Sequence, residues 1–421
     1  MAEVQLDGKF WLPTDPDHKV PGWVTFSPTA GGSLTLLDSF EGIDDFDNPR
    51  PDYNRILGES IHGGLTLDDC RLEFLNPFQR RQRFAVGKLL NKVYYESGEA
   101  VEADRLVTRI SDLMLWVLDG APELGFKPEE LAGGNIPIVK RHSEDIDLGN
   151  GARLNLIHGL AHSFNMGLTQ IRSTATPQFE FDAPVELDAA LEHAFDLLAA
   201  VTVAADRVVA FEDVTFSHPD LLMSDGSRRL AVEVHQQWRA QADPNRRQLD
   251  SNRAAFTYGQ LGRGDGLRRF LEAVRNHRAL TRQIIRPLYD TAPTVQDSFF
   301  TRVAALEGLD KQQHGDGLSL RERLERLASN TGASFESLVG DGDAVARWSK
   351  RMVKLRNSIG HGDPVPLHQS AAELYEMSEA AYWLFVLNLL VEADAPAAVY
   401  TNLTTTTRRF IFLRKHVRRH Y

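Results

Sequence analysis

The sequence predicts an α+β protein in which an N-terminal β-rich, sandwich-like domain (residues 1–240) precedes an all-α helical bundle (residues 241–421). Short extended runs broken by glycine and proline dominate the first half. Longer segments with apolar residues three and four positions apart dominate the second half. Because 421 residues exceed one ordinary hydrophobic core, two or three domains are expected.

The N-terminal segments alternate extended runs with turns, which is typical of an antiparallel sheet. The first expected strands are residues 23–26, 34–37, 55–58, 65–67 and 71–74. Further strands are expected within residues 105–118, 136–140, 152–157 and 178–181, then a helix over 187–209 and a strand over 231–234. This succession predicts a β-sandwich or barrel-like domain that ends near Trp238.

The second half has the caps and periodicity of helices. The expected helices cover residues 266–289, 295–309, 319–332, 341–360 and 370–396. Pro287 should end or bend the first, while Ser319 and Glu322 form a capping box that opens the third, which Gly332 closes. Residues 382–391 are apolar nearly all round, so we expect them at the centre of the bundle.

The helix before the glycine-rich stretch at residues 360–364 carries the most informative polar residues. It can begin at Asp341 or Asp343, and its apolar stripe consists of Val345, Trp348, Met352, Leu355 and Ile359. Asn357 and His361 stand one turn apart, roughly opposite that stripe, and Arg356 lies between the two faces. The three polar residues therefore point away from the core of this chain.

Arg356 and His361 suit phosphodiester chemistry. A guanidinium neutralises phosphate charge, and an imidazole exchanges a proton with a ribose 2′-OH or a leaving oxygen near neutral pH. The alternative is a solvated helix end, in which His361 caps free carbonyls and Arg356 pairs with a carboxylate.

Glu307 falls on the same side of its helix as Phe300, Val303 and Ala304. A carboxylate there needs a partner, and Arg356 is the partner that we expect. The alternative is a carboxylate that leans into solvent near the helix end.

Net charge is −11, but the charges are unevenly spread. Residues 38–69 are acidic, whereas residues 263–287 are arginine-rich and include Arg275 and Arg282. Local patches decide phosphate binding, so we expect RNA contacts from basic residues of this segment and of the motif helix: Arg275, Arg282, Lys350, Arg351 and Lys354. The alternative is that these arginines form an ordinary solvated face.

Several classes of function are disfavoured. Cys70 is the only cysteine, so it cannot form an intrachain disulfide, and a buried thiol is expected. His158 and His162 have metal-ligand spacing if helical, but no third ligand is evident, so neither a metal nor a cofactor is expected. The chain shows no secretory signal and no membrane-spanning run, which predicts a cytoplasmic protein.

The run Arg356-Asn357-Ser358-Ile359-Gly360-His361 resembles the Arg-x4–6-His motif of the HEPN (higher eukaryotes and prokaryotes nucleotide-binding) ribonucleases. Phe10-Trp11-Leu12-Pro13, together with residues 20–26, resembles the opening of the N-terminal domain of ApeA-like anti-phage proteins. The resemblance thus covers nearly the whole chain.

This resemblance implies a metal-independent endoribonuclease that acts in abortive infection, with two HEPN domains forming a homodimer around one RNA cleft. It implies that His361 handles the proton, Arg356 binds the phosphate, Asn357 orients them and Glu307 holds Arg356. It further implies transfer RNA as a candidate substrate and a phage-encoded trigger. The separate composition of the β-rich half, its acidic residues 38–69 and its lack of a catalytic constellation indicate a sensor role for the N-terminal domain. The rival interpretation is a non-catalytic HEPN dimerisation module whose β-rich domain binds a phage protein or glycan.

Overall fold

The computed structural model describes residues 3–40, 52–76, 80–96, 98–117, 142–165, 168–223, 225–237, 254–290, 293–360 and 367–421. The strands are β1 (Val4–Leu12), β2 (Asp15–Ser27), β3 (Gly31–Leu36), β4 (Asp52–Ser60), β5 (Gly63–Asn76), β6 (Arg81–Asn91), β7 (Glu102–Ile110), β8 (His142–Gly149), β9 (Ala152–Asn165), β10 (Leu168–Glu186), β11 (Phe211–Ser217) and β12 (Val232–Gln236).

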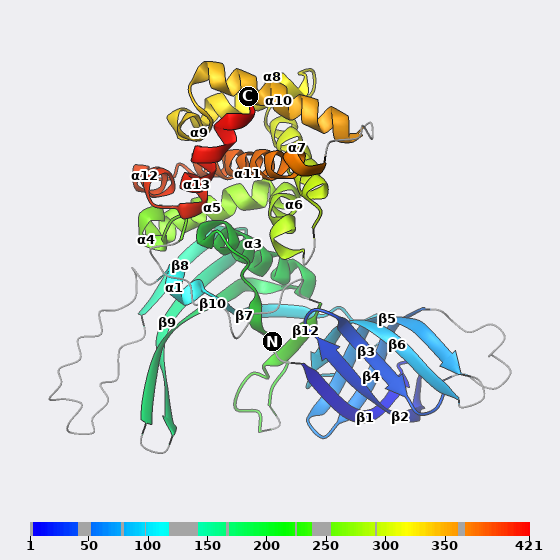
Figure 1. The fold of residues 1–421 in the computed structure, drawn as a ribbon. Helices are drawn as coiled ribbons and strands as arrows, with labels where there is room; N and C mark the ends of the chain where they lie inside the picture. Colours follow the sequence, from blue (N-terminus) through cyan, green and yellow to red (C-terminus); the bar gives the residue numbers. More distant parts are fainter. Residues whose placement is uncertain are drawn as a thin grey trace.

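The helices are α1 (Leu113–Trp116), α3 (Leu187–Ala205), α4 (Tyr258–Leu261), α5 (Arg263–Asn276), α6 (Arg278–Tyr289), α7 (Val295–His314), α8 (Leu320–Thr331), α9 (Ala333–Val339), α10 (Gly342–Gly360), α11 (Leu367–Glu392), α12 (Ala397–Thr405) and α13 (Arg408–His416), followed by the 3-10 turn η4 (Val417–His420). The predicted α+β class, with a β-rich first half and a helical second half, is confirmed (Figure 1).

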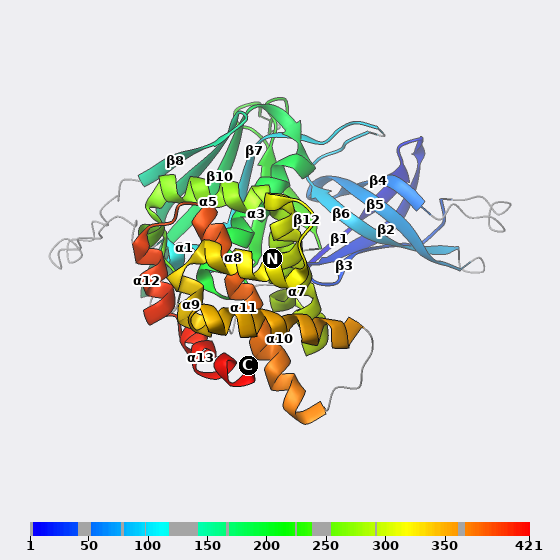
Figure 2. The same cartoon turned by 90° about the horizontal axis from the view of Figure 1, so that it is seen from above.

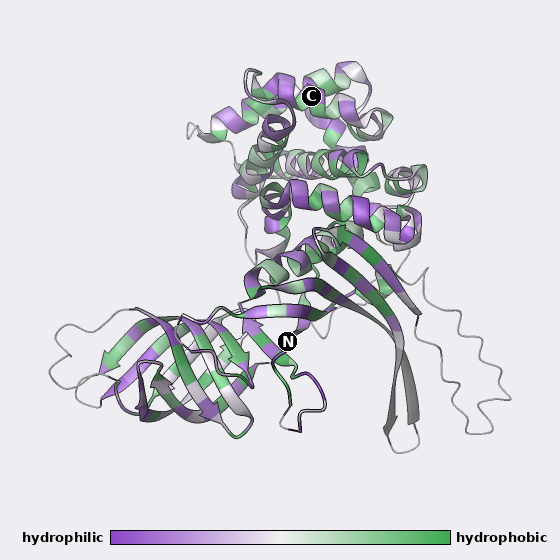
Figure 3. Cartoon of the chain, turned by 180° about the vertical axis from the view of Figure 1, so that it is seen from behind, coloured by the Kyte–Doolittle hydropathy of each residue, from purple (hydrophilic) through white to green (hydrophobic). Residues whose placement is uncertain are grey.

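Strands β1 to β6 close into a barrel, the second of the two expected architectures. Their order is β3-β2-β1-β4-β5-β6, and β3 pairs again with β6 from Gly32 opposite Val86 to Leu36 opposite Gln82. A Cβ at Gly32 would lie 2.6 Å from ring carbons of Phe26 and 2.8 Å from the Val86 side chain, so this close approach requires glycine. Hydrophobic and hydrophilic residues alternate along the barrel strands, as expected for a filled interior (Figure 3).

A second part of the sheet leaves the barrel through β6. Residues 88–91 of β6 pair with β12, and the order continues as β11-β7-β10-β9-β8. Helix α3 packs on β7 and β10, between this part of the sheet and the helical bundle (Figure 1).

Helix α11 lies at the centre of the bundle, where it packs on α5, α7, α8, α9 and α13 (Figure 2). Its side chains from Tyr382 to Leu390 are buried, which confirms the expected central segment except at the exposed Val391. Asn388 is accommodated because its amide donates to the carbonyls of Leu384 and Leu327.

The second part of the sheet and the bundle share one hydrophobic core. A single cluster of buried side chains includes Leu106 of β7, Leu197 of α3 and Leu384 of α11, whereas the barrel has its own cluster. The indole of Trp116 also donates to the carbonyl of Phe256 at 2.9 Å. The predicted domain boundary at residue 240 therefore does not coincide with a boundary between hydrophobic cores. The two-domain division remains a prediction.

The expected helix over residues 266–289 is instead two helices, α5 and α6. His277 separates them, with Nδ1 2.8 Å from Gln312 Oε1 and Nε2 2.7 Å from Glu392 Oε2. These contacts to α7 and α11 hold the break, while Pro287 lies inside α6.

Other expected boundaries also differ. Residues 65–67 and 71–74 belong to the single strand β5, and the strand expected within 105–118 ends at Ile110 before α1. Helix α7 continues past residue 309 to His314. The capping box of Ser319 with Glu322 and the closing Gly332 are confirmed. Residues 136–140 and Trp238 lie outside the described residues.

Buried ion pairs attach α3 to the bundle. Asp206, the C-cap of α3, binds Arg409 of α13 at 2.5 Å, and Arg409 also pairs with Glu379 of α11. Glu379 in turn binds Arg302 of α7 at 2.6 Å. Burial raises the pKa of Asp206 to about 6, although Arg409 opposes this shift. Burial also acts to raise the pKa of Glu379, but Arg409 and Arg302 outweigh it and lower that pKa.

Glu379→Gln should lower the free energy of unfolding by about 3 kcal/mol or more, because two buried guanidinium groups lose their shared counter-charge. Asp206→Asn should lower the free energy of unfolding by less, because burial already favours the neutral form of Asp206.

The pKa of Asp206 rises from 3.8 to about 6 on folding, so its ionisation opposes folding. The wild type should therefore lose stability relative to Asp206→Asn as the pH rises from about 4 to about 6. Urea unfolding across this range measures both effects, and equal costs for the two substitutions would contradict the assigned charge states.

Candidate functional site

Helix α10 ends in the predicted polar motif. Its first turn begins where the carbonyl of Asp341 accepts the N–H groups of Ala344 and Val345. Arg356, in the last turn, is partly buried and Asn357 is exposed, whereas Trp348 and Met352 are fully buried. The polar end of the helix thus faces away from the core, as expected. His361 lies outside the described residues.

The Arg356 side chain lies on an aromatic ring of α7. Its guanidinium carbon is 5.7 Å from the centroid of the Phe300 ring, and Nη1 donates to Asn357 Oδ1 at 3.4 Å. Phe300 is 41% exposed, whereas Phe299 and Val303 are buried. No sequence motif marks Phe300 as part of the site. The signal was the Phe299-Phe300 pair, because adjacent residues on a helix point about 100° apart and only one of them can lie at the centre of a narrow apolar stripe.

Within the part of the chain that the structure describes, Glu307 forms no ion pair or hydrogen bond with Arg356, so the expected pairing is wrong. Among the described residues, Glu307 instead pairs with Lys311 one turn further along α7, with 3.2 Å between Nζ and Oε1. Seven residues of helix, about 10 Å, separate Glu307 from Phe300, which lies under Arg356. The Glu307 carboxylate, two turns away from Phe300, is therefore too far from the guanidinium that contacts this ring.

Three basic residues on α10 that we expected to bind RNA have different surroundings. Lys350 and Lys354 are exposed and form no ion pair within the part of the chain that the structure describes. Arg351 is bound through two nitrogens to the carboxylate of Glu373 on α11, at 2.5 and 2.7 Å. This hydrogen bonding raises the pKa of Arg351. Arg351 therefore joins two helices, and the two lysines remain free to meet a ligand.

Arg275 and Arg282 lie on the side of the bundle that faces the sheet. Arg282 binds Glu192 of α3 through two nitrogens at 3.1 and 2.7 Å. Arg275 donates to the carbonyl of Leu148 in β8 at 2.9 Å. Helix α10 instead packs on α7, α8 and α9, so the structure does not bring these two arginines to the motif (Figure 1).

Two family models match the chain. One, described as ApeA N-terminal domain 1, covers residues 5–225, which is more than half of the 421 residues. The other, described as Apea-like HEPN, covers residues 283–398 and includes α10 with Arg356. The chain belongs to the ApeA-like family of HEPN-containing proteins. Comparisons with curated proteins and with solved structures return no match.

HEPN domains are generally ribonucleases, and they commonly dimerise and act on RNA. The matched HEPN region runs from α6 to the first residues of α12, so it contains both Arg356 and Phe300. This ApeA-like chain therefore carries its candidate site within its HEPN domain.

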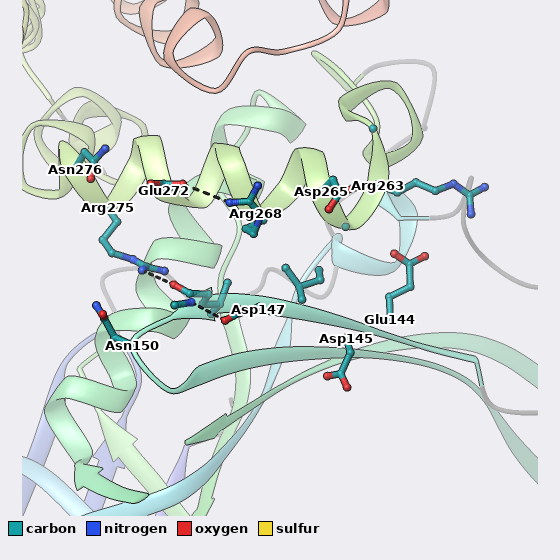
Figure 4. Close-up of a pocket in the computed structure, with 15 residues that line it drawn as sticks. Glu144, Asp145, Asp147, Asn150, Arg263, Asp265, Arg268, Glu272, Arg275 and Asn276 are labelled. Atoms are coloured by element: carbon teal, nitrogen blue, oxygen red, sulfur yellow. Dashed lines mark hydrogen bonds and ion pairs between the residues drawn. The ribbon is translucent and has the colours of Figure 1, made fainter. Parts of the chain in front are cut away.

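A cavity of about 1010 Å³ lies elsewhere in the ApeA-like chain, between β8 and α5 (Figure 4). Its described lining includes five carboxylates from Glu144, Asp145, Asp147, Asp265 and Glu272 but only three guanidinium groups from Arg263, Arg268 and Arg275. Some of these charges already have internal partners, such as Arg268 with Glu272 at 3.7 Å. The mixed lining does not suit a polyanion such as RNA.

The other expected or excluded features can also be placed. His158 and His162 lie on the strand β9, where residues four apart are about 13 Å apart, so the helical metal spacing does not form. Cys70 is buried, and burial raises the pKa of its thiol. Within the described ranges, no cluster of three or more His, Cys, Asp or Glu side chains is arranged for a metal ion. No described helix is long and apolar enough to cross a bilayer.

Arg351→Ala should lower the free energy of unfolding by about 2 kcal/mol, because it leaves the nearly buried Glu373 carboxylate without its bidentate partner. Lys350→Ala, one residue away on an exposed position, should change it by less than about 0.5 kcal/mol. Urea unfolding of both variants measures this difference. Equal effects would mean that Arg351 has no structural role.

Proposed function

We propose that this ApeA-like protein is a HEPN endoribonuclease that cleaves RNA without a metal ion. The observation that carries the proposal is the exposed polar end of α10, where Arg356 lies against Phe300 and beside Asn357 within the Apea-like HEPN region. His361 follows Gly360, the last described residue of the helix, directly in the sequence.

Arg356 is the phosphate-binding group of the proposed site. A guanidinium has five N–H donors, and among the described residues the only hydrogen bond of Arg356 is the one from Nη1 to Asn357, so further donors can bind phosphate oxygens beside the Phe300 ring. Asn357 orients the guanidinium through its amide oxygen. Glu307 is not part of the proposed site, because it pairs with Lys311 and not with Arg356.

In the proposed reaction the ribose 2′-oxygen attacks the adjacent phosphorus, and the bond from phosphorus to the 5′-oxygen breaks. The 2′-OH proton passes to a base and the leaving 5′-oxygen receives a proton, which are steps that an imidazole performs near neutral pH. We assign this proton transfer to His361, and Arg356 offsets the charge that develops on the phosphoryl oxygens. The products are a 2′,3′-cyclic phosphate and a 5′-hydroxyl, and no step requires a Lewis acid.

A dimer completes the proposed site. One chain presents one motif helix, and HEPN domains commonly dimerise, so we propose that two α10 ends face each other across one RNA cleft. The exposed Lys350 and Lys354 on the same helix supply charge for the RNA backbone.

The proposed biological role is cytoplasmic anti-phage defence by abortive infection, with transfer RNA as a candidate substrate and a phage-encoded molecule as the trigger. We assign a sensor role to the β-rich region, which matches the ApeA N-terminal domain 1 model. The second part of the sheet shares its hydrophobic core with the bundle, so a partner that binds this part of the sheet acts directly on the helices.

Arg356→Ala should lower the rate of RNA cleavage by about 100-fold or more. Arg356→Lys should fall within about tenfold of the alanine variant, because an ammonium cannot reproduce the planar contacts to the ring and to phosphate. Single-turnover cleavage of total RNA by full-length protein measures this. Arg321→Lys, at an exposed arginine of α8, is the matched control and should cleave like the wild type. A lysine variant with most of the wild-type activity would reduce Arg356 to a general electrostatic contributor.

A further inference from the structure

We propose that Phe300 is a platform on which a nucleobase next to the scissile phosphate stacks. This inference rests on the proposed ribonuclease function and extends it to how the RNA is held. Phe300 is an aromatic side chain on the surface of α7, and neither family resemblance nor sequence motif assigned it.

The ring is exposed because of its position on the helix. Phe299 and Val303 occupy the buried side of α7, and Phe300 therefore points outward with 41% of its surface accessible. One turn away on the same side, Ala304 contributes only a methyl group and Gln296 an uncharged amide. The nearby Asp297 carboxylate is engaged by the hydroxyl of Thr294 at 2.7 Å. The surroundings of the ring thus leave room for another flat group.

The contact with Arg356 ties the ring to the phosphate site. The guanidinium lies 5.7 Å from the ring centroid, so a phosphate bound at the guanidinium edge is held beside the ring. A base and its phosphate are joined through a single ribose, which brings the adjacent base within reach of Phe300. Aromatic side chains stack on any base, and such stacking is typical of proteins that hold single-stranded RNA.

The exposed basic residues of α10 also favour RNA binding at this end of the helix. Arg347, Lys350 and Lys354 are exposed on successive turns that lead toward the motif. They provide a path for the RNA backbone along the outer face of the helix, which also carries Asn357, the hydrogen-bond partner of Arg356. The backbone is then held by charge and the base at the cleavage site by stacking.

The test compares full-length wild type with Phe300→Leu and Phe300→Tyr on a short RNA whose cleavage position has been mapped. Phe300→Leu should raise the KM for cleavage and the Kd for RNA by about fivefold or more. Phe300→Tyr should restore both, because it keeps the ring. Phe412→Leu is the control, since Phe412 is also exposed, at 54%, and stacks on His416 of α13.

A second comparison separates base stacking from support of Arg356. RNAs that lack the base on either side of the scissile phosphate are tested with wild type and Phe300→Leu. On one of these RNAs the two proteins should bind equally, because the stacked base is missing. A penalty that persists on both would mean that the ring only supports Arg356, and the platform would be refuted.

Two other results would also overturn the proposal. One is equal binding of intact RNA by wild type and Phe300→Leu. The other is dissociation of the oligomer by Phe300→Leu in sedimentation experiments, which would make the ring a protein interface. If the proposed ribonuclease function is wrong, wild type and Arg356→Ala will cut RNA equally or not at all. The binding comparisons of wild type with Phe300→Leu still test the role of Phe300 in that case.

Discussion

Two glutamates on α11 hold the helices that carry the proposed site. Glu373 binds Arg351 of α10, and Glu379 binds Arg302 of α7. Phe300 is two residues before Arg302, and Arg356 is five residues after Arg351, so the relative position of ring and guanidinium depends on these ion pairs. Both carboxylates are nearly buried, and a buried charge that loses its partner destabilises the fold strongly. The two ion pairs therefore hold α7 and α10 firmly on α11.

The same ion pairs reach the β-rich half. Glu379 shares Arg409 with Asp206 at the end of α3, and α3 lies on the second part of the sheet. A displacement of α3 would therefore act on Arg409, Glu379 and Arg302 in turn, and Arg302 lies two residues after Phe300 in the sequence. The continuous hydrophobic core between sheet and bundle favours such coupling over independent domain motion. Single substitutions at these residues are a better probe of regulation than removal of the N-terminal half, which would uncover that core.

Local patterns in the sequence were sufficient for the class of fold and for the end of α10. The apolar stripe of α10, the capping box at Ser319 and the apolar α11 segment all act within one helix, so sequence spacing reports them. The features that were missed depend on contacts between distant segments. His277 breaks a helix through Gln312 and Glu392, and β3 closes the barrel on β6 about fifty residues away.

The candidate site shows the same limit. Arg356 and Asn357 were found because they belong to one short motif. The Glu307 pairing failed because periodicity gives the side of a helix but not the level at which two helices meet. Arg351 resembled Lys350 and Lys354 in charge, and only the neighbouring Glu373 on another helix distinguishes them.

The most direct test of the central claim is the chemistry of the RNA ends. Purified full-length protein and its Arg356→Ala variant are incubated with RNA in excess EDTA, and the product termini are identified by mass spectrometry. The account predicts 2′,3′-cyclic phosphate and 5′-hydroxyl ends from the wild type and at most traces from the variant. Products with 3′-hydroxyl and 5′-phosphate ends, or cleavage that EDTA abolishes and Mg²⁺ restores, would contradict it.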